Sequence, residues 1–397
     1  MPRNEKTGLV PSAGSGNGSA TNGSLDALTA AMRAVADRPL KRAVSFPAGT
    51  YISEELAERE IERIFRKDWI CLGRADEVAK PGDYITSEVA GQPIVTTRNK
   101  KGAIQSFANV CRHRSRLVAD GEGNASKLVC PFHGWCYDLD GRLSSAPRMK
   151  GAEDFDKRDY RLPTIRTDIW EGWIYVTLDE DAPPLAERFA LAAEKTRNYR
   201  MAEYTTLFRA DEVRETNWKL FMENFMEPYH VQMTHEGSTN MYRADSNIGI
   251  DLFPGEAPFL SYHYEEWGGG FAENAKKLAP DLTNFEATRA VLIGNFPSHV
   301  YAVFPGGHML WMSLHPERAS RVRMRWGVAL APGYLELTGE DPAEIRAVYE
   351  TLNAEDKSMI EPQYRGYASP TPGTGQLSPL EAPIWEFGRY LADQLCG

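Results

Sequence analysis

The pattern of apolar and polar residues changes several times along the chain and predicts its main elements. The first residues are rich in glycine, serine and asparagine, as flexible segments are, and we expect a flexible arm over residues 1–40. In the segment 53–73, Leu56, Ile64 and Phe65 lie among charged residues with helical spacing. A helix is therefore expected to lead from the arm into the first domain.

A different pattern follows, in which short alternating segments are separated by glycine, proline and aspartate. It runs from about residue 78 to residue 168 and predicts a small all-β unit. The apolar segment 169–179 resembles a buried strand that leaves this unit. Together with the helical lead-in, the first domain is expected over residues 41–168.

The remainder of the chain, residues 169–397, mixes strands with helices. Segments such as 321–331 have the composition of strands. A long helix is predicted to begin at Asp341 and Pro342, which suit an N-cap and a first helical residue, and to extend to about residue 366. The expected fold class is therefore α+β, with an all-β domain followed by a larger α+β domain.

Composition limits the possible functions. The chain has 397 residues, enough for two or three domains, and 42% of them are hydrophobic, so a sizeable core is expected. A formal net charge of −10 argues against general binding to nucleic acids. Neither a membrane-spanning apolar run nor the apolar centre of a secretion signal is found. Five cysteines, an odd number, favour a reducing cytoplasm over a secreted disulfide framework.

Two short clusters each contain one cysteine and one histidine. Cys111 and His113 form the first cluster, and Cys130 and His133 form the second. Thiolates and imidazoles are common ligands of zinc and of iron–sulfur centres. Zinc fingers usually pair cysteine with cysteine and histidine with histidine. One ligand of each kind in each loop instead suits a [2Fe–2S] centre, in which two cysteines bind one iron and two histidines the other. A zinc site is the alternative.

A second group of candidate metal ligands lies about a hundred residues further along the chain. On a helical wheel Glu223, Glu227 and His230 fall on one side, opposite an apolar stripe. Alone, this pattern is also typical of a solvated surface helix. His230 and His235 are five residues apart, so a regular helix would separate them by ~140°. They converge only if the helix is broken, and Pro228 could break it.

The long helix offers a third ligand for such a metal. Asp356 falls within the apolar stripe of that helix, whereas Glu355 is expected to point about 100° away. A carboxylate on a core-facing stripe is costly unless it is paired or bound to a metal. A salt bridge to an arginine is the alternative, but two unassigned histidines and one buried aspartate together favour iron. They form the ligand set of non-haem Fe(II) oxygenases. The predicted stripe consists of Ile345, Val348, Leu352 and Met359.

Both sets of residues, in this order, resemble those of the catalytic α subunit of Rieske-type non-haem iron oxygenases, the aromatic ring-hydroxylating oxygenase family. The resemblance covers roughly residues 45–395 and rests on CxH…CxxH, ENFMEPYHVQMTH and EDKSMIEPQ. It implies an N-terminal Rieske domain with a [2Fe–2S] cluster and a C-terminal helix-grip domain, an antiparallel sheet around a long helix, with a mononuclear Fe(II). The implied cluster ligands are Cys111, His113, Cys130 and His133, and the implied iron ligands are His230, His235 and Asp356.

In this family the two metals lie far apart within one subunit, and the resemblance implies electron transfer between neighbours in a head-to-tail trimer. The matching bridging residue is Glu227, expected to link His133 of the partner subunit to His230. The commonest residue at this position is Asp. Glu occurs in relatives that act on carnitine-like ammonium compounds, whereas the spacing with Pro228 resembles relatives that hydroxylate aromatic acids. Asn224 is expected close to the iron.

The expected electron source is NAD(P)H, and a separate flavin reductase is expected to pass on its electrons. The alternative is that the reductase acts together with a ferredoxin. The sequence has no GxGxxG element and no flavin fingerprint of its own. Arg112, Arg114 and Arg116 surround the first cluster loop of an otherwise acidic protein, and one interpretation is a docking patch for the donor. Local pairing with Asp120 and Glu122 is the other. Whether a β subunit accompanies the trimer stays open. Neither a nucleic acid nor a membrane is expected as a binding partner.

The expected reaction is hydroxylation or oxidative dealkylation of a small organic substrate with O2, and the substrate predicted first is an aromatic compound. The alternative is a quaternary ammonium compound such as carnitine, choline or betaine. An electron-carrying Rieske protein without oxygenase activity and a zinc-stabilised binding module are the alternatives from other classes. Aromatic residues of the second domain suit either substrate, although most are expected in the core. They are Tyr262, Tyr264, Trp267, Phe271, Tyr301 and Trp311.

Overall fold

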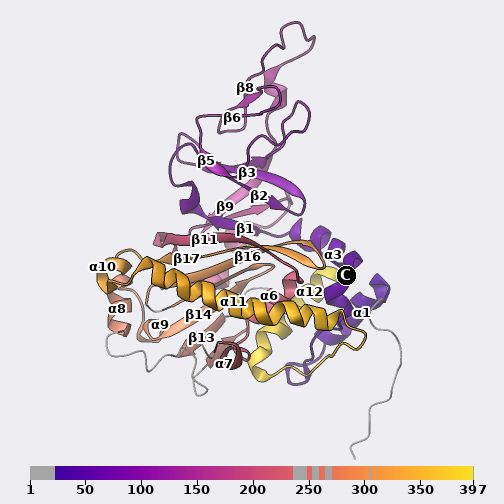
Figure 1. Cartoon of the computed structure of the whole chain (residues 1–397), viewed down its shortest axis with the longest axis vertical. Coiled ribbons are helices and arrows are strands. Elements are labelled where there is room, and N and C mark those ends of the chain that lie inside the picture. The colour runs from indigo at the N-terminus through magenta and orange to yellow at the C-terminus, as the bar shows by residue number, and fades with distance from the viewer. Residues whose placement is uncertain (1–22, 236–247, 253–258, 264–270, 305, 397) are drawn as a thin grey trace, which may run out of the picture.

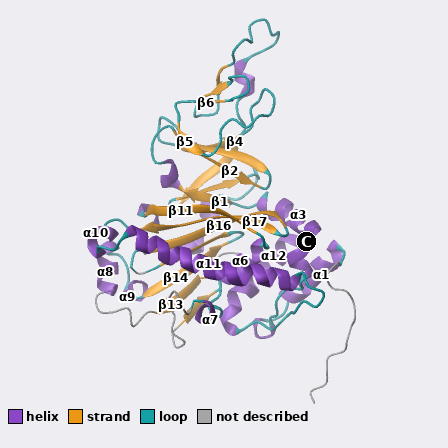
Figure 2. Cartoon of the chain, in the orientation of Figure 1, coloured by secondary structure: helices purple, strands orange, loops and turns teal. Residues whose placement is uncertain are grey.

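The structure, a computed structural model, describes residues 23–235, 248–252, 259–263, 271–304 and 306–396. Within them, two seven-stranded antiparallel sheets lie one above the other, and a three-stranded sheet forms the tip of the upper part (Figure 1). Figure 2 shows that most helices gather around the lower sheet. This arrangement confirms the predicted α+β class, with a β domain before a larger mixed domain.

The first sheet forms most of the N-terminal domain. In spatial order its strands are β1 (Ile70–Arg74), β10 (Trp173–Thr177), β9 (Thr164–Trp170), β4 (Ile104–Ala108), β3 (Gln92–Arg98), β2 (Asp83–Val89) and β5 (Glu122–Asn124). β9 and β10 form a hairpin, and its turn residues Glu171 and Gly172 both have positive φ, as tight hairpin turns require. The segment 169–179 is thus not the single strand expected from the sequence. The sheet also extends beyond residue 168, where the domain boundary was predicted.

The tip of this domain is a small sheet that supports the two loops with cysteine and histidine. Its strands are β6 (Leu128–Val129), β7 (Cys136–Tyr137) and β8 (Leu143–Ser145). Trp135 and Tyr137 are buried beneath the loops, in a hydrophobic cluster that also contains Val95 of β3 and Phe107 of β4. The loops are therefore supported by the first sheet as well as by the small sheet.

The second sheet forms the centre of the C-terminal domain. In spatial order its strands are β11 (Thr205–Arg214), β17 (Arg321–Leu330), β16 (His308–Arg318), β15 (His299–Val303), β14 (Arg289–Asn295), β13 (Phe259–His263) and β12 (Ile248–Asp251). Side chains alternate across it, so that Met312 faces the helices and Trp311 faces the N-terminal domain. The two domains are joined by the Ser313 hydroxyl, which donates to the Cys71 carbonyl at 2.7 Å, and by further contacts of β1 with β16 and β17.

Helices cover the outer face of the second sheet and the ends of the chain. Helix α11 crosses the sheet in Figure 1 and begins at Pro342 with Asp341 as its N-cap, as predicted. Among the described residues, none of the helices is long and apolar enough to cross a membrane. The α-helices are α1 (Leu25–Ala36), α2 (Gly49–Ile52), α3 (Glu54–Glu60), α4 (Leu185–Arg188), α5 (Ala190–Thr196), α6 (Trp218–Phe225), α7 (Val231–Thr234), α8 (Phe271–Leu278), α9 (Asn284–Ala287), α10 (Tyr334–Thr338), α11 (Pro342–Tyr367) and α12 (Ala382–Leu395).

Two predicted elements near the N-terminus differ in the structure. The arm expected over residues 1–40 contains α1, which packs on α12 through the buried side chains of Leu28 and Met32. The helix expected over 53–73 ends with the π-helical turn that closes at Phe65, and the apolar residues after it form β1. In the arm, the glycine- and serine-rich composition concealed a helix. In the segment 53–73, apolar residues that continue past the helix end concealed the change from helix to strand.

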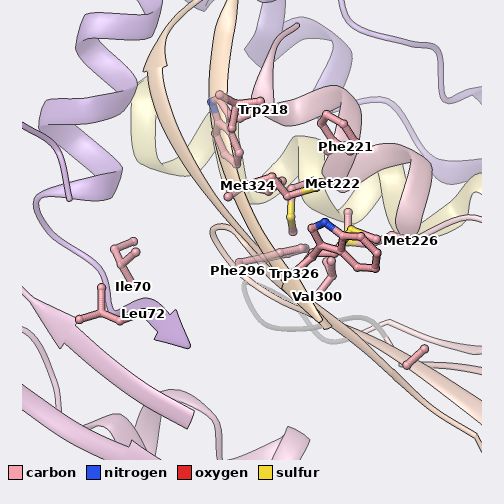
Figure 3. Packing of buried hydrophobic residues seen from close by; sticks show 14 of the residues in the cluster. Ile70, Leu72, Trp218, Phe221, Met222, Met226, Phe296, Val300, Met324 and Trp326 are labelled. Atoms are coloured by element: carbon pink, nitrogen blue, oxygen red, sulfur yellow. The ribbon is translucent and has the colours of Figure 1, made fainter. Parts of the chain in front are cut away.

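Packing of α6 on the sheet places the segment that follows it. Figure 3 shows Trp218, Met222 and Met226, at the sheet-facing side of α6 and just after it, against Met324 and Trp326 of β17. These side chains are at most 2% exposed. Because the helix is fixed along its length, the loop that continues from Met226 is delivered to one defined edge of the sheet.

Candidate metal centres

Two turns of the same shape bring the first set of predicted ligands together. In each turn the cysteine amide donates to the carbonyl of the residue five positions further on. Cys111 and Cys130 are buried, whereas His113 and His133 are exposed, with their Nδ1 atoms 3.2 Å apart. The His113 ring stacks on Trp135 with 4.8 Å between ring centroids. Two buried thiols and two facing imidazole nitrogens fit the ligand set of a [2Fe–2S] cluster.

The surroundings of the thiols support this arrangement. The Tyr137 hydroxyl lies 3.4 Å from Sγ of Cys111 and accepts the Arg112 amide at 3.0 Å. Burial raises the pKa of the Cys130 thiol; the Phe132 amide lowers that pKa, and the neighbouring Cys111 thiol raises it again. Two adjacent buried thiols become thiolates readily only when a metal takes up their charge. The site is therefore suited to a metal cluster rather than to free thiols.

The second set of ligands meets where α6 is interrupted. The helix ends before Pro228, as predicted, and α7 begins after His230. Nε2 of His235 lies 3.2 Å from Oδ1 of Asp356, and Nε2 of His230 lies 3.6 Å from the same oxygen. The ligand atoms of the three residues all lie within 4.8 Å of one another. Two imidazoles and one carboxylate in this geometry fit a mononuclear Fe(II) with open positions.

Each histidine of this triad has its second ring nitrogen on a carboxylate. Nδ1 of His230 lies 2.6 Å from Oε1 of Glu227, whose other oxygen accepts the His230 amide at 3.0 Å. Nδ1 of His235 lies 2.8 Å from Oε2 of Glu355. Burial alone would lower the pKa of His235, but the carboxylates of Asp356 and Glu355 outweigh it and raise that pKa. The two outer carboxylates orient both imidazoles toward Asp356.

The buried face of α11 differs from the predicted stripe. Val348 and Met359 are 45% and 50% exposed, so both lie outside that face. Glu355 does not point away from the site but reaches His235 from the edge of the same face. The residues that are buried on α11 are Ile345, Tyr349, Leu352, Asn353 and Ile360. Asp356 lies four residues after Leu352 and four before Ile360, so it falls within this face, whereas Glu355 lies at its edge. The polar Asn353 concealed this register in the sequence.

The two other polar residues predicted on α6 have different positions. Asn224 lies at the site, where its Nδ2 donates to Oδ1 of Asp356 at 3.1 Å. Glu223 does not join Glu227 and His230. It is buried, and its Oε1 accepts a hydrogen bond from the Tyr51 hydroxyl at 2.8 Å, away from the triad. The helical wheel misplaced Glu223 because it continued the helix through Pro228.

A pocket of about 600 Å³, its open mouth included, adjoins the triad. Its walls carry aromatic Phe225, Phe304 and Tyr349 and several aliphatic side chains of the sheet. Tyr301 and Trp311 face the N-terminal domain and are core residues, as expected for most of the aromatic set. The side chains of the other four, Tyr262, Tyr264, Trp267 and Phe271, lie outside the described residues.

The arginines beside the cluster loops are free of the local pairing that was their alternative explanation. Glu122 pairs with Arg209, and within the described parts of the chain neither Glu122 nor Asp120 forms an ion pair with Arg112, Arg114 or Arg116. All three arginines are exposed. Phe132 and Val129, both 53% exposed, lie on the same tip, and the Arg114 guanidinium lies 5.4 Å from the Phe132 ring centroid.

Comparison with known families supports both centres. Residues 68–164 match the Rieske [2Fe-2S] domain, and residues 193–397 match the ring hydroxylating alpha subunit (catalytic domain). The glycine betaine monooxygenase oxygenase subunit of Pseudomonas aeruginosa is 35% identical, over 91% of each chain. The carnitine monooxygenase oxygenase subunit of Acinetobacter baumannii is 29% identical, over 82% of this chain and 85% of that protein. The choline monooxygenase of Spinacia oleracea is 26% identical, over 88% and 78%.

Solved structures show the same fold. A quaternary ammonium Rieske monooxygenase in complex with L-carnitine superimposes with a TM-score of 0.75 at 24% identity, over 89% of this chain and 96% of that one. Naphthalene 1,2-dioxygenase from Rhodococcus sp., bound to indole, gives a TM-score of 0.79 at 19% identity, over 93% and 98%. Enzymes named for an ammonium compound and for an arene thus share this architecture.

Proposed function

Because the chain belongs to the ring-hydroxylating oxygenase α subunits with a Rieske [2Fe–2S] domain, we propose that it oxidises a small quaternary ammonium compound. The family makes it an oxidoreductase with a [2Fe–2S] cluster and a mononuclear iron, which is more than an electron carrier or a zinc module. The observation that carries the substrate class is the set of relatives named for glycine betaine, carnitine and choline. It favours the ammonium alternative over the aromatic substrate predicted first from the sequence.

The residues of the site suit this proposal. Phe225, Phe304 and Tyr349 offer aromatic faces to an onium group, and the carboxylates of Asp356 and Glu227 lie on the same pocket. A cation without N–H groups is recognised by such surfaces rather than by hydrogen bonds to its nitrogen. In the family resemblance, Glu at position 227 is typical of relatives that act on carnitine-like compounds, whereas the spacing with Pro228 resembles relatives that hydroxylate aromatic acids.

In the proposed reaction the chain holds and orients the reactants. His230, His235 and Asp356 would hold the iron, which supplies activation of O2 when bound. Glu227 and Glu355 keep Nε2 of each imidazole directed at the metal position. The apolar walls exclude water and place a methyl group of the substrate toward the open side of the triad. With O2, two electrons from NAD(P)H and two protons, hydroxylation of that N-methyl carbon would give a hydroxymethyl ammonium ion and water. This ion then breaks its N–C bond and releases formaldehyde, the tertiary amine and a proton.

We propose further that the protein works in the cytoplasm as a head-to-tail homotrimer, in which Glu227 bridges His230 and His133 of the partner subunit. Electrons come from NAD(P)H through a separate reductase that docks near Arg112, Arg114 and Arg116. Reversal of Arg114 and Arg116 to Glu is expected to slow reduction by the reductase, while dithionite still reduces the cluster. Equal reductase-driven rates in this variant and the parent would contradict the docking assignment.

The experiment that tests the substrate class is a panel assay with purified oxygenase and a family reductase. The panel contains glycine betaine, L-carnitine, choline and several aromatic acids, and the readouts are NADH oxidation, formaldehyde release and product identification. We expect coupled turnover with an ammonium compound and not with the aromatic acids. Coupled hydroxylation of an aromatic acid, without turnover of any ammonium compound, would overturn the proposal.

A matched variant separates the iron site from the cluster. His230→Ala is expected to lose the mononuclear iron and turnover while it keeps the red-brown colour of a Rieske cluster, because the two ligand sets share no residue. Normal turnover in His230→Ala would show that the triad is not the catalytic centre.

A further inference from the structure

Asn353 is a pocket residue that the ligand set leaves without a role. It lies on α11 one turn before Asp356 and lines the same pocket. Its side chain is 6% exposed, and its Oδ1 is buried without a hydrogen-bond partner among the described residues. A buried acceptor with no partner destabilises the folded state, so such groups occur where a ligand or water completes them.

The orientation of the Asn353 amide is fixed from behind. Its Nδ2 donates to Oε1 of Glu212 at 3.1 Å, and the same oxygen accepts the indole N–H of Trp326 at 2.7 Å. Oε2 of Glu212 pairs with Arg214 at 2.5 Å. A carboxylate held in this way accepts hydrogen bonds and donates none, so the NH2 group must face Glu212. Asn353 lines the pocket and Glu212 does not, so the carbonyl oxygen of Asn353 lies on the side of its amide away from Glu212.

We propose that Asn353 is a specificity residue whose carbonyl oxygen receives the positively charged head of the substrate. This inference rests on the proposed function, because it adds one further group of that pocket that senses the charge of the substrate. The methyl hydrogens of a quaternary ammonium carry partial positive charge and make weak C–H···O contacts. Tyr349, one turn earlier on the same helix, presents an aromatic ring to the same pocket. A neutral alkyl head of equal shape interacts only weakly with the dipole of the Asn353 carbonyl group. It leaves the Asn353 oxygen without a partner.

The test compares two ligands of equal shape that differ in charge. Glycine betaine and tert-butylacetate share a carboxylate and a head with three methyl groups, and the central atom is charged nitrogen in one and neutral carbon in the other. Dissociation constants are measured by calorimetry on the oxidised holoenzyme without O2, so that turnover does not enter. In Asn353→Leu the preference for glycine betaine is expected to fall about fivefold or more, mainly through weaker binding of glycine betaine.

Two further variants separate recognition from packing. Asn353→Ala removes the amide without placing a larger apolar side chain in the pocket wall, so a lost preference there does not come from overpacking by leucine. The preference should fall in the same direction as in Asn353→Leu. Leu352→Met changes the neighbouring pocket side chain without altering polarity, and it should shift both dissociation constants together and keep their ratio.

The outcomes distinguish this inference from the proposed function. A parent enzyme that prefers glycine betaine, with the same preference in folded Asn353→Leu or Asn353→Ala, overturns the role of Asn353 and leaves the substrate class intact. A parent enzyme without any preference for glycine betaine over tert-butylacetate overturns the role of Asn353 as well. Failure of the ammonium compounds in the turnover panel would instead remove the proposed function, and the inference with it.

Discussion

Each histidine of the iron site is held by a carboxylate that is not part of the triad. For His235 this carboxylate is Glu355, at 2.8 Å from Nδ1. Such outer partners orient the ring and raise its basicity, and their loss typically costs 10- to 100-fold in metal affinity. Glu355→Ala is therefore expected to weaken Fe(II) binding by about one to two orders of magnitude. Competition with a chromophoric chelator measures this affinity.

Glu350 provides the matched control for Glu355 on the same helix. It is exposed and pairs with Arg346, away from the triad. Glu350→Ala removes an equal charge from α11, so its Fe(II) affinity should equal that of the parent. If the two variants lose affinity equally, the effect belongs to the charge of the helix and not to the hydrogen bond.

At the cluster, the corresponding contact is made by a tyrosine. The Tyr137 hydroxyl lies 3.4 Å from Sγ of Cys111, and hydrogen bonds to sulfur ligands raise the reduction potential of a cluster. Tyr137→Phe is expected to lower the midpoint potential by tens of millivolts without loss of the cluster. A redox titration followed by electron paramagnetic resonance checks this, with Tyr84→Phe as the control. An unchanged potential in Tyr137→Phe would show that the hydroxyl does not stabilise the reduced cluster.

At the residue scale, the chemistry of the ligands was predictable but their supports were not. The spacing of Cys111 and His113 is short and belongs to one turn, so local sequence determines its geometry. Glu355 and Asn353 depend on how far α11 is rotated about its axis, and a rotation of one residue exchanges the buried and exposed positions. That rotation is set by packing against α6 and β11, which no local pattern records.

At the scale of elements, α6 makes three polar contacts away from the iron site. The buried ammonium of Lys219 pairs with Glu60 at 2.5 Å, and Trp218 donates to the same carboxylate at 2.7 Å. One turn later, Glu223 accepts the hydroxyl proton of Tyr51 on α2. These contacts connect α6 to the helical lead-in, which therefore helps the sheet to hold the segment with the iron ligands.

The contact of Glu223 should make stability depend on pH. Burial raises the pKa of Glu223 to about 7 from 4.5, although the hydrogen bond from Tyr51 opposes this shift. Between these values the folded protein keeps a proton that the unfolded chain has released. The free energy of unfolding should therefore decrease as pH rises through this window, by on the order of 3 kcal/mol for this group. Glu223→Gln stays neutral and removes this part of the decrease.

Urea unfolding at about pH 5 and about pH 8 measures the effect. The stability of Glu223→Gln relative to the parent should be greater at the higher pH, where the parent must bury an ionised carboxylate. Glu62→Gln, a change at an exposed glutamate of the lead-in, should show no such trend. A difference between Glu223→Gln and the parent that is equal at both pH values would contradict the raised pKa.

Elements with strong local signals were predictable, and elements defined by partners were not. Asp341 and Pro342 determine the start of α11 through local capping, and Pro228 determines the end of α6. Helix α1 follows the glycine- and serine-rich residues and is stabilised by α12 from the other end of the chain. A pairing across the whole sequence cannot be inferred from composition at one end.

At the scale of the whole molecule, the cluster site and the iron site lie at opposite ends of the folded subunit. In Figure 1 the tip with β6 and β8 is at the top, whereas α7, beside the iron ligands, is near the bottom. The exposed tip carries Phe132 and Val129, and the iron site carries Tyr229 and Met233, which are 60% and 81% exposed. Apolar side chains exposed at both ends are suited to contact between copies of the chain. The family resemblance to a head-to-tail trimer is consistent with this placement.

Mixed oligomers test whether electrons pass between subunits. A variant without the cluster, His133→Ala, and a variant without the iron, His230→Ala, should each be inactive alone. When both are produced together, a trimer contains a cluster of one subunit beside the iron of its neighbour, and turnover should return to a substantial fraction of the parent rate. Mixing the separately purified variants, without subunit exchange, provides the control. Transfer within each chain would leave the co-produced oligomer inactive, because neither subunit holds both centres, and would contradict the trimeric arrangement proposed here.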